Sequence, residues 1–259
     1  MSLAKLLDLK GKVALVTGGS RGLGLQMAEV LGELGARVAI TARKQHELDE
    51  AAKHLKSLGI EALPLACDMG DLQSIAPLVG TVLEKLGPID VLVNNAGTSW
   101  GAPTVDHPLD AWNKVMTLNL TALFVLTQEV GRRSMVPRKS GKVINIASIQ
   151  GLTGTYPEGM PTLAYNASKG AVVNLTRTLA AEWAPLGINV NAIAPGFFPT
   201  KMTAPIAAAL GKDATAEMAP MKKVGGPEDL KGAVALFATE ACAFITGQTL
   251  AVDGGLTAV

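Results

Sequence analysis

Two side chains that can exchange protons lie four residues apart, at Tyr165 and Lys169. On a helix, residues i and i+4 share a face, so the phenol and the ammonium would face a common site. A phenol normally ionises at about pH 10 and is a poor base at neutral pH. A neighbouring ammonium stabilises the phenolate and lowers that pKa. The pair therefore predicts proton transfer to or from a substrate oxygen.

Two further polar residues, Ser148 and Asn119, are expected around the same site. Ser148 follows a strand expected at 142–146, at the sheet edge where ligands bind in open α/β folds. Its hydroxyl can orient a substrate oxygen. Asn119 lies in a helix expected to flank the same crevice. A carbonyl that receives a hydride must also gain a proton, so the four residues fit hydride transfer between a nicotinamide and a carbonyl or secondary alcohol. The positive charge of the oxidised nicotinamide would further favour the phenolate.

A glycine-rich turn, Thr17 to Gly24 (TGGSRGLG), follows the first expected strand. Glycines permit a tight turn and let backbone N–H groups approach a pyrophosphate at the start of the next helix. The spacing is G-x-x-x-G-x-G rather than the usual dinucleotide G-x-G-x-x-G, and no Lys-Ser/Thr follows the last glycine, as a P-loop requires. We therefore expect a dinucleotide to contact Gly18, Ser20, Arg21, Gly22, Leu23 and Gly24.

The end of the second expected strand indicates which dinucleotide. An NAD site usually has an acidic residue there for the adenosine ribose, but this chain has Ala42 followed by Arg43. A guanidinium can bind a 2′-phosphate with two hydrogen bonds, and Arg21 could assist from the glycine turn. The sequence therefore favours NADP(H), and NAD(H) is also possible.

The elements that must position these residues alternate along the chain. Short β-branched runs bounded by glycine indicate strands, and periodic apolar runs indicate helices. Strands are expected at 12–17, 37–41, 62–66, 89–93, 142–146, 189–193 and 249–252. Helices are expected at 22–34, 46–58, 71–86, around 109–115 and 118–133, from about 162 to 185, and at 227–240.

This alternation predicts an α/β fold, because parallel strands need long crossovers. Right-handed crossovers give a single doubly wound Rossmann domain over residues 1–259, with a seven-stranded parallel sheet and helices on both faces. Two stretches break the pattern. Residues 151–161 are rich in Gly and Pro, and residues 197–223 are partly helical without a strand. Both are expected as loops near the site, the second as a substrate-loop segment.

Composition excludes several classes of protein. The net charge is +1, charged residues are 17% and aromatic residues 4% of the chain. These values predict no nucleic-acid partner and no polybasic membrane surface. No apolar run has the length of a membrane span, and no signal peptide is expected. The two cysteines, Cys67 and Cys242, match no disulfide or metal pattern. We expect a soluble cytoplasmic protein with no metal, the three histidines having no ligand spacing.

The chain resembles the classical short-chain dehydrogenase/reductase family. The matching motifs are Thr17–Gly24, Asp68, Asn94–Gly97 (NNAG), Asn119, Ser148, Tyr165–Lys169 (YNASK), 195–200 (PGFFPT) and 252–255 (VDGG). They occur in family order over nearly the whole chain. The resemblance implies an oxidoreductase that acts on a small carbonyl or alcohol, commonly as a homotetramer, with the helices that carry Tyr165 and residues 227–240 at the interfaces.

The resemblance also implies a role for each matching residue. Tyr165 is the acid/base, Ser148 positions the carbonyl, Lys169 binds the nicotinamide ribose and tunes Tyr165, and Asn119 supports a water-mediated relay to Lys169. Asp68 would meet the adenine, and Pro195 to Thr200 the nicotinamide carboxamide and phosphates. The full set of expected cofactor contacts is Gly18, Ser20, Arg21, Gly22, Leu23, Gly24, Arg43, Asp68, Met69, Asn95, Ala96, Gly97, Tyr165, Lys169, Pro195, Gly196, Phe198 and Thr200.

The substrate is less closely specified. The stretch between Ser148 and Tyr165 is longer than is usual in the family, and this insert is expected to bulge over the pocket. Stretches 141–148, 168–177, 194–203 and 245–255 look most like gluconate 5-dehydrogenases, which favours a sugar acid. The 3-oxoacyl-thioester (ACP or CoA) reductases share most of these features. Phe197, Phe198, Trp100 and Met202 could line an apolar pocket, although Trp100 could equally fill the loop after Gly97. Lys201 could bind a carboxylate.

A different class of function is a dinucleotide-binding sensor without catalysis. A sensor needs the glycine turn but not the proton-handling residues. Because Tyr165, Lys169, Ser148 and Asn119 are all present, the enzyme is the favoured reading.

Overall fold

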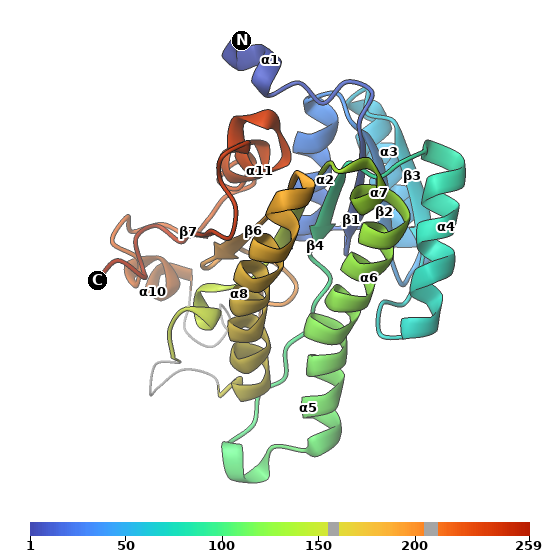
Figure 1. The fold of residues 1–259 in the computed structure, drawn as a ribbon. Helices are drawn as coiled ribbons and strands as arrows, with labels where there is room; N and C mark the ends of the chain where they lie inside the picture. Colours follow the sequence, from blue (N-terminus) through green and yellow to red (C-terminus); the bar gives the residue numbers. More distant parts are fainter. Residues whose placement is uncertain (155–160, 205–211) are drawn as a thin grey trace.

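A seven-stranded sheet forms the centre of the protein (Figure 1), which is described here by a computed structural model covering residues 1–154, 161–204 and 212–259. All strand pairs are parallel, in the order β3-β2-β1-β4-β5-β6-β7. The strands are β1 Val13–Thr17, β2 Arg37–Ala42, β3 Ala62–Ala66, β4 Val91–Asn94, β5 Gly141–Ile146, β6 Ile188–Pro195 and β7 Thr249–Val252. The predicted doubly wound domain and all seven predicted strands are confirmed.

The strand order reverses between β1 and β4, which pair with each other at the middle of the sheet. In open parallel sheets, ligands bind outside the carboxyl ends of the strands at such a reversal, because adjacent loops diverge to opposite faces there. The glycine turn follows β1, and Ser148 comes two residues after β5. Both therefore lie at the same edge of the sheet.

Helices cover both faces of the sheet (Figure 1). One apolar core lies beneath α2 (Gly22–Glu33), α3 (Gln45–Ser57) and α11 (Lys231–Ala238). A second lies beneath α4 (Ile75–Leu86), α6 (Ala122–Val130) and the long helix α8 (Leu163–Trp183). Spacing explains which faces are buried: α3 buries Leu48, Ala51 and Leu55, three and four residues apart, and most of its other positions are polar or charged.

The helix between β4 and β5 differs from prediction. Two helices were expected at 109–115 and 118–133, but the helical stretch is continuous from α5 (Leu109–Met116) to α7 (Val136–Arg138). It contains two π-helical turns, η3 (Thr117–Thr121) and η4 (Gly131–Met135). A π turn adds one residue to a helical turn and shifts the faces of the residues after it, so a 3.6-residue period cannot reveal it. The first of these turns contains Asn119.

Smaller differences occur at element ends. The helix expected at 227–240 begins at Lys231, after a turn in which the Asp229 carboxylate accepts from Gly226 N at 2.7 Å. Short elements with no predicted counterpart are α1 Leu3–Leu6, η2 Thr104–Asp106 and η5 Ile149–Gly151. The 3₁₀ turns η1 Leu72–Ser74, η6 Ala184–Leu186 and η7 Glu240–Cys242 lie at the ends of predicted helices, and α10 Lys212–Glu217 lies in the segment expected to be partly helical. Parts of the two stretches expected as loops, 155–160 and 205–211, lie outside the described residues.

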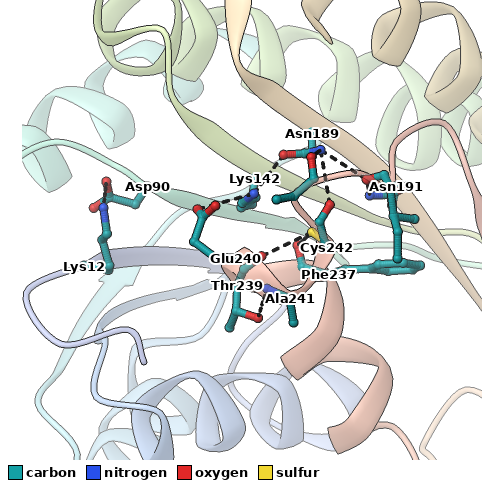
Figure 2. Close-up of polar contacts among 12 residues, drawn as sticks. Lys12, Asp90, Lys142, Asn189, Asn191, Phe237, Thr239, Glu240, Ala241 and Cys242 are labelled. Carbon is teal, nitrogen blue, oxygen red and sulfur yellow. Dashed lines mark hydrogen bonds and ion pairs between the residues drawn. The ribbon is translucent and has the colours of Figure 1, made fainter. Parts of the chain in front are cut away.

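Polar side chains gather at the amino ends of the strands (Figure 2). The glycine turn follows the carboxyl end of β1, so these side chains lie at the other edge of the sheet. Lys142, at the start of β5, donates to the Asn189 Oδ1 of β6 at 2.8 Å and lies 3.5 Å from Glu240 Oε1. The Asn189 amide donates in turn to the carbonyl of Cys242. These contacts hold η7 against the amino ends of β5 and β6, so the polar groups at this edge have a structural role.

Candidate active site

The predicted proton-handling residues meet at the carboxyl edge of the sheet. Ser148 is buried two residues beyond the end of β5, and its hydroxyl forms a hydrogen bond with the Tyr165 phenol. Tyr165 and Lys169 lie in the first two turns of α8, on one face as their spacing predicted. The Ser148 Oγ also accepts from Gln150 N at 3.2 Å, which fixes the start of η5. A hydroxyl and a phenol are thus held side by side at the sheet edge.

Lys169 is buried beneath this pair. Its Nζ donates to the carbonyl oxygen of Ile146 at 2.6 Å and lies 5.6 Å from the centre of the Tyr165 ring. Burial lowers the pKa of Lys169 to about 8, because removing the ammonium from water disfavours its charge. Near neutral pH this buried cation therefore holds its proton more weakly than an exposed lysine.

The phenol shifts in the opposite direction from the one expected. Burial raises the pKa of Tyr165, and the hydrogen bond with Ser148 offsets only part of this rise. The sequence predicted that Lys169 would lower this pKa, but the ammonium donates to a backbone carbonyl instead. The groups of the chain itself thus keep the Tyr165 phenol protonated at neutral pH, which is the form that can give a proton to a carbonyl oxygen.

Asn119 reaches the site through its π turn and is fully buried. Its Oδ1 accepts from Thr98 N at 2.8 Å, and its Nδ2 donates to Thr98 O at 2.9 Å and to Ser168 Oγ at 3.0 Å. The side chain therefore holds the loop after β4 against α8. The Oδ1 accepts only one of the two hydrogen bonds it can take from the described residues, so the relay from Asn119 to Lys169 stays a prediction.

Three residues that contribute to this arrangement were missed in the sequence. Thr98 is the loop residue that Asn119 binds, and Ser168 Oγ donates to Tyr165 O at 2.7 Å. At Gly151, an added Cβ would lie 2.6 Å from the backbone carbon of Lys169. Gly151 thus permits close approach of η5 to α8. Only Ser168 carried a signal, because it stands inside the YNASK motif.

The glycine turn has the geometry of a phosphate cradle. Gly18 and Gly22 have positive φ angles of 65° and 53°, which favour glycine. A Cβ on Gly24 would lie 2.1 Å from Gly18 O, so the turn packs directly on α2. The residue that precedes α2, Arg21, makes no side-chain cap, so the first N–H groups of this 12-residue helix remain available. The turn therefore fits a dinucleotide pyrophosphate.

The residues predicted for the adenosine end lie after β2, β3 and β4. Arg43 and Asp68 are exposed, and Met69 is buried. Arg21, which was expected to assist Arg43 at a 2′-phosphate, already has a partner: its Nη1 donates to Glu47 Oε2 at 2.7 Å. Glu47 had no place in the sequence-based site.

The NNAG segment braces the turn from the neighbouring strand. Asn95 Nδ2 donates to Thr17 O at 2.8 Å, and Thr17 Oγ1 accepts from both Asn95 N and Ala96 N at 2.9 Å. A Cβ on Gly97 would lie 3.2 Å from Asn119 Oδ1 and 3.7 Å from Lys169 Nζ. Gly97 therefore lies where the cofactor turn meets the proton-handling residues.

The segment after β6 contributes mainly backbone. Gly196 packs on Asp253, where a Cβ would lie 2.8 Å from its Cα. The ring of Phe198, another predicted cofactor residue, is buried and packs against Gly225. Thr200 lies over the glycine turn, with its Cγ2 3.6 Å from the position of a Gly22 Cβ.

A pocket lies beyond the carboxyl ends of β6 and β7. Of the apolar residues expected around the substrate, Phe197 and Phe198 line it, whereas Trp100 and Met202 are exposed. The Lys223 ammonium in its wall pairs with Asp229 at 3.1 Å. The pocket is lined by Phe197, Phe198, Thr215, Ala219, Met221, Lys223, Gly225, Asp229, Val252, Asp253 and Gly254.

No cluster of three or more His, Cys, Asp or Glu side chains suited to a metal occurs among residues 1–154, 161–204 and 212–259. His54 pairs with Glu29 at 2.8 Å, and Cys67 and Cys242 are both buried free thiols. In the described part of the chain, no helix is both long and apolar enough to cross a membrane.

Known proteins share both the sequence and the fold. The sequence model of the short chain dehydrogenase family matches residues 12–211. Gluconate 5-dehydrogenase from Gluconobacter oxydans (strain 621H) is 38% identical over 259 residues, 99% of each chain. The rhamnolipids biosynthesis 3-oxoacyl-[acyl-carrier-protein] reductase of Pseudomonas aeruginosa is 40% identical over 255 residues, 96% of this chain and 97% of that protein.

A solved structure agrees over the full length. The crystal structure of a gluconate 5-dehydrogenase from Burkholderia cenocepacia J2315, in complex with NADP and tartrate, has a TM-score of 0.92 and 34% identity, with 100% of both chains covered. The match of the family model over most of the chain, together with these full-length relatives, shows that this chain belongs to the short-chain dehydrogenase/reductase family of NAD(P)-dependent oxidoreductases.

Proposed function

We propose that this enzyme transfers a hydride between NADP(H) and a carbonyl or secondary alcohol, with Tyr165 as the acid/base. The observation that carries the proposal is the hydrogen-bonded pair of Ser148 and Tyr165, held above the buried Lys169. The nicotinamide supplies the hydride when bound. Tyr165 gives its proton to the carbonyl oxygen in reduction, and Ser148 donates a hydrogen bond that orients the same oxygen.

Lys169 and Asn119 act around this pair. The Lys169 ammonium lies 5.6 Å from the centre of the Tyr165 ring. It does not offset the effect of burial on the protonated phenol, and its proposed role is to attract the phenolate that proton donation leaves. Asn119 fixes the loop at Thr98 and, through Ser168, the first turn of α8. A sensor without catalysis is disfavoured, because it would not need Ser148, Tyr165, Lys169 and Asn119 at one site.

NADP(H) is the proposed cofactor. The exposed Arg43 follows β2 where an acidic residue would favour NAD(H). The Burkholderia gluconate 5-dehydrogenase was crystallised with NADP, as was the Pseudomonas aeruginosa RhlG, which has a TM-score of 0.89 and 39% identity. The remaining predicted contacts, from Gly18 to Thr200, belong to the same proposal.

A sugar acid is the proposed substrate. The Gluconobacter relative is named gluconate 5-dehydrogenase, and the Burkholderia structure contains tartrate. The substrate-loop segment 197–223 supplies Lys201 as a candidate partner for a carboxylate. A 3-oxoacyl thioester is the second candidate, because Phe197, Ala219 and Met221 give the pocket beyond β6 an apolar wall.

A homotetramer remains a prediction carried by the family resemblance. Exposed apolar side chains at Phe124 on α6 and Phe244 before β7 are compatible with buried contacts between copies. Light scattering after size-exclusion chromatography would determine the mass, and a monomer would contradict the prediction.

The experiment that tests the function is a substrate panel read at the absorbance of NADPH. The panel contains 5-keto-gluconate and related sugar acids, 3-oxoacyl thioesters, cyclic ketones and steroids. We expect turnover of a sugar acid, and loss of about two to four orders of magnitude in Tyr165→Phe with NADPH binding retained. A Tyr165→Phe enzyme with the wild-type rate on every substrate turned over would contradict the mechanism. Turnover of thioesters alone would replace the sugar acid by the second candidate.

A further inference from the structure

Glu47 lies in the first turn of α3, next to the glycine turn, and is not among the expected cofactor contacts. Both of its carboxylate oxygens are engaged. Oε2 lies 2.7 Å from Arg21 Nη1 and 3.5 Å from Ser20 Oγ, and Oε1 lies 3.5 Å from Lys44 Nζ. Its side chain is 19% exposed, whereas those of Arg21 and Lys44 are 50% and 57% exposed. Glu47 is thus a mostly buried anion that holds two exposed cations.

The charges around Glu47 are mainly positive. Burial raises the pKa of Glu47, but the charges of Arg21, Lys44 and Lys201, with a hydrogen bond from Lys44, outweigh it and lower the pKa overall. The carboxylate is therefore ionised at neutral pH. Lys201 follows Thr200, which lies over the glycine turn, so this group of cations includes one from the segment after β6.

Arg43 is in a different state. It stands one residue beyond β2, is exposed, and forms no ion pair with any described residue. Of the two arginines expected to bind an adenosine 2′-phosphate, one is therefore free and the other is neutralised by Glu47. A 2′-phosphate that uses Arg21 must share it with, or take it from, this carboxylate.

We propose that Glu47 is a specificity-determining residue: it is an internal counter-anion that competes with the 2′-phosphate for Arg21 and Lys44, and so limits the preference for NADPH over NADH. This inference rests on the proposed NADP(H) site. The 2′-phosphate is an anion and meets this competition and the repulsion of the carboxylate. The neutral 2′-hydroxyl of NADH meets neither, so the two cofactors respond differently to the charge of Glu47.

The test is the variant Glu47→Gln, which keeps the shape of the side chain and removes its charge. Dissociation constants for NADPH, NADH and the fragment 2′,5′-ADP are measured by cofactor or tryptophan fluorescence and by calorimetry. We expect NADPH and 2′,5′-ADP to bind about three- to tenfold more tightly than to the wild type, and NADH to bind with unchanged or weaker affinity. The gain for 2′,5′-ADP should shrink at high salt.

Two controls separate the local contact from a general change of charge. Glu50→Gln makes the same change of charge one turn later on α3, at an exposed side chain that contacts neither Arg21 nor Lys44. Glu50→Gln should leave the affinity for NADPH relative to NADH within about twofold of that of the wild type. In an Arg21→Gln background, Glu47→Gln should lose most of its effect, because the contested cation is gone.

The outcomes that would overturn the inference differ from those that would overturn the cofactor proposal. If Glu47→Gln leaves the affinity for NADPH relative to NADH unchanged, or raises both affinities equally, there is no competition at the 2′ position. If the affinity for NADPH relative to NADH falls in Glu47→Gln, Glu47 orients Arg21 toward the phosphate, and this result also overturns the proposed competition. Equal affinities of the wild type for NADPH and NADH, with no effect of Arg43→Ala, would contradict the proposed NADP(H) preference itself.

Discussion

The ammonium of Lys169 lies 2.6 Å from the carbonyl oxygen of Ile146 and has no carboxylate partner among the described residues. Burying a cation costs free energy when its only partner is a backbone carbonyl, because one carbonyl replaces only part of the hydration that the ammonium has in water. Burial accordingly lowers the pKa of Lys169 to about 8. The protein thus holds an unfavourable charge at the site where the proposed chemistry needs one.

Replacing Lys169 by Met should therefore stabilise the protein more at pH 7 than at pH 10. The folded pKa of about 8 lies below the unfolded value of 10.5, so the wild type bears the full cost below pH 8. That cost is relieved as the pH rises from 8 to 10.5. The corresponding free energy is at most about 3 kcal/mol. Chemical denaturation of both proteins at pH 7 and pH 10 measures the change, and an identical difference at both values would contradict it.

The two directions of the reaction should respond oppositely to pH. Burial raises the pKa of Tyr165, so the phenol stays protonated through neutrality. Reduction uses the protonated phenol and should proceed at neutral pH and decline as the phenol ionises. Oxidation needs the phenolate and should accelerate as the pH rises above neutrality. Rates of both directions with saturating substrate and cofactor would show these limbs, and parallel profiles would argue against Tyr165 as the group that titrates.

Sequence reasoning identified most of the fold, because each buried parallel strand is a short apolar run and each helix has its own period. It also brought together Ser148, Tyr165 and Lys169, which the structure places at one site and whose proposed roles follow from side-chain chemistry and sheet-edge position. It missed Glu47, whose importance comes from a contact with Arg21 across 26 residues. The π turn at Asn119 was equally hidden, because one added residue leaves no mark in an apolar stretch. Partners distant in sequence and local helix geometry require coordinates.

Asn119→Ala should lower turnover more than it lowers cofactor affinity. The change removes both contacts to Thr98 and the contact to Ser168, each of which holds a backbone near the reacting atoms. We expect kcat to fall by about ten- to a hundredfold as the Tyr165 phenol loses alignment. Stability should fall by about 1–3 kcal/mol because buried backbone groups lose partners.

The conservative variant Asn119→Asp distinguishes positioning from general destabilisation. Aspartate still accepts from Thr98 N but cannot donate to Thr98 O or Ser168 Oγ. It should therefore restore only part of the loss, and the pH profile of oxidation should shift in both variants. Wild-type pH profiles with the same drop in stability would mean that Asn119 acts only as a structural residue.

Gly24→Ala should abolish tight dinucleotide binding. The new Cβ would lie 2.1 Å from Gly18 O and 2.6 Å from Asn95 Nδ2, so the glycine turn must move away from α2. We expect NADPH to bind at least about tenfold more weakly, with some loss of stability. Gly232→Ala is the matched control, since Gly232 is also helical and a Cβ there meets nothing within 4 Å. It should bind NADPH normally and be slightly more stable than the wild type.

The amino edge of the sheet should affect stability without affecting the site. Lys142 and Lys12 both lie 3.5 Å from a carboxylate there, Glu240 and Asp90 respectively (Figure 2). The Lys142 side chain is only 10% exposed and also donates to Asn189, whereas that of Lys12 is 48% exposed. Lys142→Met should therefore cost about 1–3 kcal/mol, because Asn189 Oδ1 loses its charged donor.

Lys12→Met should cost less than about 1 kcal/mol, because an exposed ion pair contributes little and Arg138 still pairs with Asp90 at 2.9 Å. Urea denaturation gives both values, and NADPH titration should show unchanged affinity in both variants. The proposed cofactor site lies at the opposite ends of the strands, so only a change transmitted along the whole length of β5 could reach it. Weaker NADPH binding by folded Lys142→Met would show that the two edges are coupled, contrary to a purely structural role for this cluster.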